Sequence, residues 1–353
     1  MSRESKKTCS AEEEDNKSFI ECAEFVLPWL SPRELASISL TCKTLNSLSK
    51  SITIRRVSDA SRNLEKNPIP FINTIDSEPY SYFIYTFSQI FSSPCLSQSW
   101  GTNPKRNVSS SVSLMKFGSN VTSLMSDSTS GCVCKNCSED TNGDIRCPCS
   151  KLKPLSLSNM GSDSSELGLM TECGPSCDCG VECKNRLTQR GVSVQVRIGK
   201  DARKGWSLYS AQFVPRGEFV CEYAGELLTT QEARKRQKKY DDIASTSQFG
   251  SALLVVREHL PSGNACLRVN IDATRVGNAA RFINHSCDGG NLSTVLVRGS
   301  GALFPRLCFF ASRDILDGEE LAFSYGEPML KQNGLKCFCG SSCCLGALPS
   351  EET

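Results

Sequence analysis

The chain has 353 residues, of which 39% are hydrophobic and 22% are charged, and its formal net charge is +2. This composition is ordinary for a soluble globular protein of two or three domains, and it suffices to bury a hydrophobic core. No stretch approaches the roughly 18 to 20 uninterrupted apolar residues that a membrane span needs, and the N-terminal residues contain no apolar run of the signal-peptide type. We therefore expect a soluble intracellular protein that does not contact membranes.

The N-terminal region predicts a disordered tail followed by a small helical module. Residues 1–17 are polar, whereas residues 18–52 place apolar side chains at helical spacing. Ser31 and Pro32 offer an N-cap and a proline in the first turn, so we expect two or three short helices within residues 18–60. The pattern resembles an F-box, a module that docks on the adaptor of a cullin ligase. The alternative is a helical lid packed on the rest of the protein.

The remainder of the chain changes from loop-type to β-type sequence. Residues 86–131 and 150–170 are rich in serine and poor in periodicity, and we expect loop insertions there. Residues 229–242 predict a helix, whose basic run at 234–239 is interpreted as a solvated face, with a nuclear-import signal as the alternative. The half beyond residue 190 is otherwise predicted to be mainly β, because short apolar runs alternate with turn-type residues. The β-type runs are 192–198, 218–225, 252–256, 267–272, 307–311 and 320–326.

The 21 cysteines are the abnormal feature of the composition. Nine of them follow the spacing C-x-C-x2-C-x9-C-x-C-x23-C-x3-C-x-C-x3-C, whose C-x-C pairs are poorly placed for internal disulfides. In a reducing compartment such a cluster indicates zinc thiolates, with a redox-active or coincidental cluster as the alternative. Nine thiolates serve three tetrahedral zinc ions if three of them bridge two metals each. The predicted ligands are Cys132, Cys134, Cys137, Cys147, Cys149, Cys173, Cys177, Cys179 and Cys183.

Four short motifs follow this cysteine block and carry a family resemblance. They are GWSLYS, EYAGELL, RFINHSC and ELAFSYG, in that order. Together they resemble the SET-domain protein-lysine methyltransferases, in particular the plant suppressor-of-variegation-related proteins, and the likeness covers about residues 61–346. It implies a mainly β SET fold with short helices, small curved sheets and a pseudoknot. The implied modules are a zinc-thiolate pre-SET region over residues 61–190, a SET domain over 191–327 and a post-SET zinc tail over 328–353.

The resemblance implies methyl transfer from S-adenosylmethionine (SAM) to a protein lysine. The lysine amine must be neutral to attack, and deprotonating a group of pKa about 10.4 near pH 7.5 costs roughly 4 kcal/mol. An apolar channel and the adjacent sulfonium lower this cost, because both disfavour the ammonium. The rest of the catalysis is positioning, since amine, methyl and sulfur must be collinear in a dry channel.

The family's motifs assign roles to individual residues. Tyr325 is the expected catalytic residue beside the methyl group and Tyr223 the second hydroxyl near the amine; the alternative for each is a structural strand tyrosine. Phe323 is the implied product-number switch, and it lacks a hydroxyl that would hold a water, which leaves room for a second or third methyl. His285 is expected to orient the cofactor rather than to bind metal. The implied cofactor-binding residues are Lys204, Gly205, Trp206, Arg281, Asn284, His285 and Tyr325.

The C-terminal stretch implies a fourth zinc site. Cys337, Cys339 and Cys344 have the spacing of the family's post-SET ligands, and the family takes its fourth thiolate from the cysteine that corresponds to Cys287. Cys343 lies one residue before the third ligand and is either a competing ligand or a spare thiol.

Three departures from the family pattern affect details of the site. Ser207 replaces the second glycine of the usual GWG motif, and Ser251 and Ala252 stand where a tyrosine is expected. Leu345 replaces a common basic residue after the last zinc ligand. These changes leave cofactor affinity and the geometry of the tail open.

The implied function is histone-lysine N-methylation with SAM on a core-histone tail, in chromatin silencing in the nucleus. The alternatives are a catalytically weak SET module that binds chromatin, or a ubiquitin-ligase adaptor acting through residues 18–52. Thirteen metal-bound thiolates and four zinc ions would bring the net charge to about −3. We therefore expect the partner to be a histone tail or nucleosome, with no strong binding of bare DNA.

Overall fold

The computed structural model describes the predicted helical region, the segment between it and the cysteine block up to residue 91, most of the β-rich half and most of the C-terminal tail. No helix among the described residues is both long enough and apolar enough to cross a membrane. The predicted tail over residues 1–17 and most of the two predicted insertions lie outside the described residues. The described residues are 18–91, 131–134, 137, 147, 149, 168–175, 177–244, 250–259, 266–300, 302, 304–326 and 335–349.

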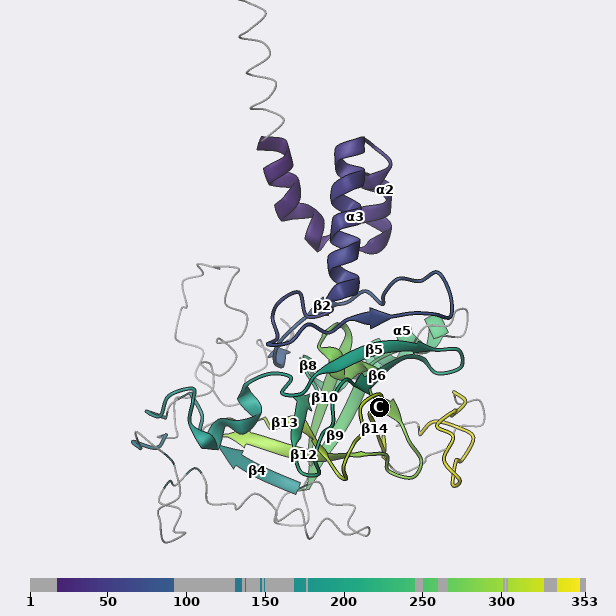
Figure 1. Cartoon of the computed structure of the whole chain (residues 1–353). Helices are drawn as coiled ribbons and strands as arrows, with labels where there is room; N and C mark the ends of the chain where they lie inside the picture. Colours follow the sequence, from purple (N-terminus) through teal and green to yellow (C-terminus); the bar gives the residue numbers. More distant parts are fainter. Residues whose placement is uncertain are drawn as a thin grey trace, which may run out of the picture.

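The N-terminal region forms the short helices expected from its periodicity. Residues 18–26 are helical and continue into η1 (Leu27–Trp29), which is followed by α2 (Pro32–Ser39) and α3 (Lys43–Ser58). Ser31 caps α2 in a capping box, in which its hydroxyl accepts from the backbone of Glu34 and the Glu34 carboxylate accepts from the backbone of Ser31. The helices stand above the strands, and α3 leads down into them (Figure 1).

A buried arginine fixes this helical module to the segment that precedes the cysteine block. Arg56, near the end of α3, donates to the hydroxyl of Tyr80 at 2.9 Å and to the carbonyl oxygens of Pro28 and Leu30 at 2.9 and 2.7 Å. Its guanidinium also lies 4.7 Å from the ring centre of Tyr82. This one side chain therefore connects η1, α3 and the segment that contains Tyr80. The base of the helical module is thus fixed to the rest of the protein.

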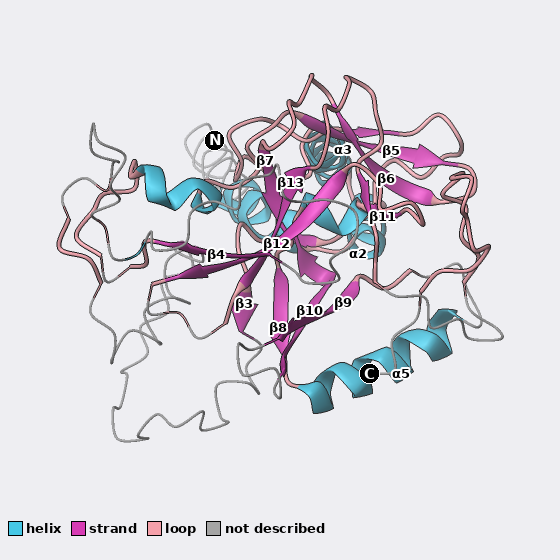
Figure 2. Cartoon of the chain, turned by 90° about the horizontal axis from the view of Figure 1, so that it is seen from below, coloured by secondary structure: helices cyan, strands magenta, loops and turns pink. Residues whose placement is uncertain are grey.

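Two larger sheets and two smaller ones make up the β-rich half, as the SET resemblance implies. Seen from below, the strands fill the middle of the molecule and α5 (Thr230–Ala244) lies along one side (Figure 2). The strands of the first larger sheet are, in spatial order, β2 (Ile84–Tyr85), β10 (Cys266–Gly277), β8 (Gly225–Leu228) and β3 (Ile90–Phe91), and β9 (Leu253–His259) also pairs with β10. The strands of the second are, in spatial order, β4 (Gly168–Glu172), β12 (Leu292–Gly299), β13 (Arg306–Ala311) and β7 (Phe219–Glu222).

The smaller sheets carry the motifs. In one, β1 (Phe71–Ile72) pairs with β5 (Val196–Asp201), which forms a hairpin with β6 (Gly205–Ser210). In the other, β11 (Asn284–His285) lies parallel to β14 (Ala322–Phe323). Two 3-10 turns complete this part: η5 (Lys184–Gln189) precedes β5, and η6 (Ala279–Phe282) precedes β11.

Several strands depart from the sequence predictions. β4 begins at Gly168, inside the segment predicted as a loop insertion, and β12 was not predicted. β3 likewise lies inside the first predicted insertion. β4 pairs with β12 in parallel register, with Gly168 opposite Val295 and Glu172 opposite Gly299. Both strands depend on this pairing across a long sequence separation, which local periodicity does not reveal.

The crossing of two motif segments forms the predicted pseudoknot. Besides the β11 and β14 pairing, the side chain of Asn291 donates to the carbonyl oxygen of Glu320 at 2.9 Å and accepts from the backbone of Ala322 at 3.0 Å. Gly290 has φ +71, and a Cβ atom there would lie 2.3 Å from the carbonyl oxygen of Ala322. The two segments cross so closely that only glycine fits at this position.

A buried ion cluster joins the cysteine block to the SET sheet. Arg306 on β13 pairs with Glu172 at 2.8 Å and with Glu222 at 3.0 Å, and both carboxylates are almost fully buried. Arg306 also donates to Thr188 in η5. Glu172 immediately precedes one of the predicted zinc ligands, and Glu222 precedes Tyr223. The cluster therefore holds the cysteine block and the strand that leads to Tyr223 in a fixed relation.

Candidate active site and metal centres

The predicted catalytic tyrosine lies two residues after the end of β14, and its hydroxyl is hydrogen-bonded to the protein backbone. The Tyr325 hydroxyl donates to the carbonyl oxygen of Ile283 at 2.8 Å, and its ring centre lies 5.0 Å from that of Phe323. Burial raises the pKa of Tyr325 above its ordinary value, so the phenol stays protonated at neutral pH. With its proton donated, the oxygen keeps its lone pairs for a ligand.

Tyr223 has the same arrangement. It lies between β7 and β8, is buried, and its hydroxyl donates to the carbonyl oxygen of Ala252 at 2.8 Å. Burial raises its pKa. Its ring centre lies 6.4 Å from that of Phe309, which also packs against Phe323 beside Tyr325, so the two tyrosines line one aromatic site. Ser251 and Ala252 stand where the resemblance leads us to expect a tyrosine, yet the backbone of Ala252 supplies the acceptor that orients Tyr223. Two neutral phenol oxygens are therefore held as hydrogen-bond acceptors.

The Asn284 side chain is the centre of a polar network beside the turn of the β5 and β6 hairpin. Its amide donates to Ser207 Oγ at 2.7 Å and to Glu320 Oε1 at 3.0 Å. The second carboxylate oxygen of Glu320 is paired with Lys204. Gly205, the first residue of β6, has φ +77, a left-handed conformation that favours glycine. Glu320 thus connects two predicted cofactor residues, Lys204 beside the hairpin turn and Asn284 on β11.

Two buried donors in this region have no protein partner among the described residues. Arg281 in η6 donates through Nε to the carbonyl oxygen of Ala273 at 2.9 Å and through Nη2 to that of Thr274 at 3.1 Å, but Nη1 has no acceptor. Burial lowers the pKa of Arg281 to about 10. The indole nitrogen of Trp206 is also buried and unsatisfied. Unpaired buried donors of this kind are expected where a ligand supplies the acceptors.

His285 uses both of its ring nitrogens within the protein. Nδ1 accepts from the backbone N–H of Tyr325 at 3.1 Å, so the proton is on Nε2, which lies 3.2 Å from Cys287 Sγ. Burial lowers the pKa of His285, which keeps the ring neutral. The side chain therefore connects Tyr325 to a predicted zinc ligand, and the cofactor contact expected of His285 is left to its backbone.

Four thiols from distant parts of the chain meet beside His285. Their sulfur atoms all lie within 4.8 Å of one another, which suits one tetrahedral metal ion. Burial raises the pKa of Cys337 to about 12, whereas burial is outweighed at Cys339, where Ser341 and the backbone of Cys287 lower the pKa to about 6. Cys343 is exposed and is not in the group. The four thiols are Cys287, Cys337, Cys339 and Cys344.

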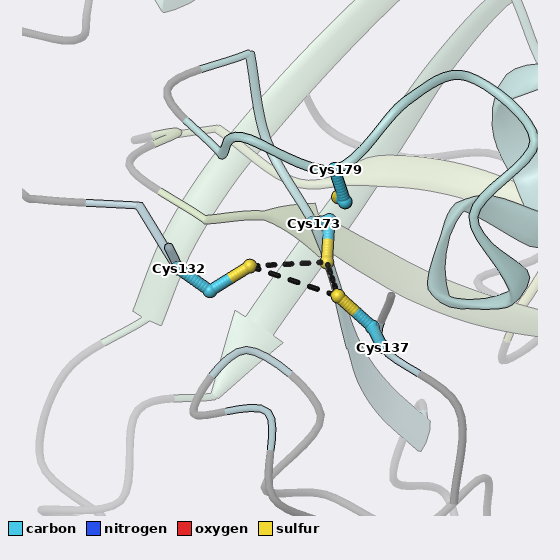
Figure 3. A group of neighbouring side chains, drawn as sticks. All are labelled: Cys132, Cys137, Cys173 and Cys179. Carbon is cyan, nitrogen blue, oxygen red and sulfur yellow. Dashed lines mark hydrogen bonds between the residues drawn. The ribbon is translucent and has the colours of Figure 1, made fainter. Parts of the chain in front are cut away.

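The nine predicted pre-SET ligands also converge. At their centre the sulfur atoms of Cys132, Cys137 and Cys173 form a near-equilateral triangle with sides of 3.7, 3.9 and 3.7 Å (Figure 3). The other six thiols surround it, and each four-thiol group contains at least two corners of the triangle. The groups are Cys132, Cys134, Cys137 and Cys147; Cys132, Cys149, Cys173 and Cys177; and Cys132, Cys137, Cys173 and Cys179.

Comparison with known proteins assigns the chain to a family. Residues 61–186 match the Pre-SET motif and residues 205–326 match the SET domain. The chain is 53% identical over 348 residues to histone-lysine N-methyltransferase SUVR3 of Arabidopsis thaliana, a match that covers 95% of this chain and 92% of that protein. The chain belongs to the SET-domain histone-lysine methyltransferases. The fold, the enzyme class and the family expected from the four motifs are confirmed.

Solved structures of other SET methyltransferases share the fold. The methyltransferase domain of human histone-lysine N-methyltransferase SETMAR is 25% identical, with a TM-score of 0.58, and the match covers 83% of this chain and 97% of that one. Arabidopsis thaliana SUVH6 in complex with SAM is 27% identical, with a TM-score of 0.58 over 82% of this chain and 55% of that one. KRYPTONITE in complex with DNA, an H3(1-15) peptide and S-adenosylhomocysteine is 26% identical, with a TM-score of 0.54 over 81% and 52%.

Sequence analysis missed several members of this SET methyltransferase site. Glu320 was recognised only as part of a motif, although it joins Asn284 to Lys204. Ser207 was noted as a departure without a role. The backbone acceptors of Ile283 and Ala252 leave no signal in the residue types, because any residue supplies a carbonyl oxygen.

Proposed function

We propose that this protein transfers methyl groups from SAM to a lysine of the histone H3 tail and acts in chromatin silencing in the nucleus. The observation that carries the proposal is the pair of buried tyrosines whose hydroxyl protons are both donated to backbone carbonyl oxygens. A relative from Schizosaccharomyces pombe, 33% identical over 62% of this chain, is named as specific for lysine 9 of H3. Lysine 9 is therefore the lysine to test first.

The proposed roles of the two tyrosines follow from their hydrogen bonds. Tyr325 presents its oxygen lone pairs to the transferring methyl, whose hydrogens carry partial positive charge beside the sulfonium. Tyr223 accepts a hydrogen bond from the lysine amine. This bond keeps the lone pair of the amine nitrogen directed at the methyl carbon. Because burial raises the pKa of both phenols, neither acts as a tyrosinate base, and the substrate ammonium must lose its proton to solvent before the site closes.

The residues around Asn284 fit SAM, which would supply an activated methyl group when bound. Arg281 Nη1 and Trp206 Nε1 are buried donors without partners among the described residues, and SAM carries carboxylate and purine acceptors. Asn284 would contact the cofactor through its side chain and His285 through its backbone. The proposed cofactor set is Lys204, Gly205, Trp206, Arg281, Asn284, His285 and Tyr325.

Phe323 is the proposed product-number switch. Its side chain is buried on β14, packed 4.8 Å from the ring centre of Phe309 and 5.0 Å from that of Tyr325. Phenylalanine holds no water beside the lysine amine, so the channel accommodates an amine that already carries one or two methyl groups.

We also propose three zinc ions in the pre-SET cluster, bridged by the sulfur triangle. Cys132 and Cys137 would share a zinc with Cys134 and Cys147, and Cys132 and Cys173 a second with Cys149 and Cys177. Cys137 and Cys173 would share the third with Cys179 and Cys183, because Cys183 lies buried in the same cluster and Cys132 already serves two metals. Every zinc then has four thiolates. Burial raises the pKa of the three triangle thiols, so they stay protonated in the absence of metal. Zinc binding must therefore displace these protons.

Replacing Cys287 by serine tests the fourth zinc. We expect the zinc content to fall from about four to about three ions per chain, because the post-SET ion loses one of four thiolates while the pre-SET cluster is untouched. Turnover should fall as well, since Cys287 contacts His285, which holds the backbone of Tyr325. Zinc analysis by mass spectrometry measures the first effect, and Cys343→Ser, which alters an exposed thiol outside the group, is the matched control.

A methylation assay tests the proposed activity. Purified protein, SAM and arrays of core-histone tail peptides are incubated, and the mass of each peptide is measured. We expect mass increases of one to three methyl groups on H3 peptides that contain lysine 9 and none when that lysine is arginine. SAM binding without turnover on any peptide or nucleosome would favour the alternative of a catalytically weak chromatin-binding module.

The function of the N-terminal helices stays a prediction. The comparisons give no support for a cullin-ligase adaptor, and the matched Pre-SET region begins at residue 61. Phe25 and Trp29 are 75% and 60% exposed, which offers an apolar surface to a protein partner. Copurification with the adaptor, compared between the full chain and a chain that begins at residue 61, tests this hypothesis.

A further inference from the structure

Ser207 is a departure from the family's glycine that has a specific contact in this chain. It lies on β6 directly after Trp206, and its side chain is fully buried. Its hydroxyl oxygen accepts a hydrogen bond of 2.7 Å from Nδ2 of Asn284. A glycine at this position would leave that amide hydrogen without a side-chain acceptor, so the serine adds a constraint on Asn284.

The constraint fixes which end of the Asn284 amide is available to a ligand. The second hydrogen on Nδ2 is donated to Glu320 Oε1 at 3.0 Å. Turning the amide over would place its oxygen against the Glu320 carboxylate, and two acceptors repel each other. Lys204 pairs with the other oxygen of Glu320 and so holds that carboxylate in this orientation. Both donors of Asn284 are therefore used inside the protein, and only Oδ1 remains for a ligand.

We infer that Ser207 is a positioning residue that, with Glu320, presents Oδ1 of Asn284 as an acceptor for the α-ammonium group of the cofactor. The inference rests on the proposed function, because it takes SAM as the ligand. SAM and its product S-adenosylhomocysteine both carry this ammonium, which is a donor only. Ser207 thus strengthens binding of the amino-acid arm of the cofactor and has no effect on binding of its adenosine part.

Calorimetric titration with two ligands tests the inference. Ser207→Ala should weaken binding of S-adenosylhomocysteine by about 5- to 20-fold, the effect of leaving one partly buried amide hydrogen without its acceptor. Binding of 5′-methylthioadenosine, which lacks the amino-acid arm, should change by less than about 2-fold. A residue with a merely structural role would change both affinities together. Ser210→Ala, at another fully buried serine of β6 whose hydroxyl donates to the carbonyl oxygen of Gln212, is the matched control.

A double-mutant cycle shows whether the effect passes through Asn284. In an Asn284→Ala background, Ser207→Ala should produce no further loss of affinity for S-adenosylhomocysteine. Ser207→Gly serves if Ser207→Ala does not fold, since glycine is the usual residue of the motif. Equal affinities of wild type and variant, or equal losses for both ligands, overturn the inference. Failure of the wild-type protein to bind SAM at all would instead overturn the proposed function.

Discussion

Replacing Cys173 by serine is expected to lower the zinc content from about four ions per chain to about one and to unfold the pre-SET region. Cys173 is a corner of the sulfur triangle and would bridge two zinc ions, and its side chain is fully buried. Structural zinc contributes on the order of 10 kcal/mol or more to the folding of a small domain. The loss of one bridge therefore removes the support of the whole cluster. Zinc analysis and circular dichroism with thermal unfolding measure the two effects.

Two control variants separate bridging from burial. Cys134→Ser alters a thiol that is found in only one four-thiol group, so it should cost about one zinc ion and leave the triangle intact. Cys308→Ser alters a fully buried thiol on β13 outside every group, and it should keep all the zinc. If Cys173→Ser retained three or more zinc ions, or lost no more than Cys134→Ser does, the bridged arrangement would be wrong.

The family, the fold and the clustering of the cysteines could be predicted because they depend on local signals. The spacing of nine cysteines and four short motifs suffices to indicate the SET fold, and Ser31 marks the start of α2. The parallel pairing of β4 with β12 could not be predicted, because a parallel partner far away in the sequence leaves no mark on either strand. The ion pairs of Arg306 could not be predicted either, because its two carboxylate partners lie on β4 and β7, far from it in the sequence.

The structure connects the predicted site residues through contacts that the sequence does not predict. The sequence separates His285 from Cys287 as a cofactor residue and a zinc ligand, yet the structure joins their side chains at 3.2 Å and adds the backbone of Tyr325 to the same ring. The predicted zinc ligand Cys287, the histidine and the predicted catalytic tyrosine are thus coupled. Such coupling depends on rotamers and on the tautomer of one ring, neither of which is encoded in a local pattern.

Replacing Tyr325 by phenylalanine is expected to lower kcat by about 100-fold or more while the affinity for SAM changes little. The hydroxyl is the only group removed, and its oxygen is the acceptor that we place beside the transferring methyl. The ring stays packed between Phe323 and His285, so the pocket keeps its shape. Loss of the hydrogen bond to Ile283 should cost about 1 kcal/mol of stability, too little to unfold the domain.

Single-turnover kinetics on a histone H3 peptide, together with calorimetric titration of SAM, separates the loss of chemistry from a loss of binding. Tyr240→Phe is the matched control, because it removes a buried tyrosine hydroxyl that donates to Asp272 at 2.8 Å on the face of the sheet covered by α5. This control should keep nearly full turnover with a comparable loss of stability. If Tyr325→Phe turned over at the wild-type rate, Tyr325 would be a strand residue held by Ile283, and the methyl group would have to be positioned by Tyr223 and the backbone alone.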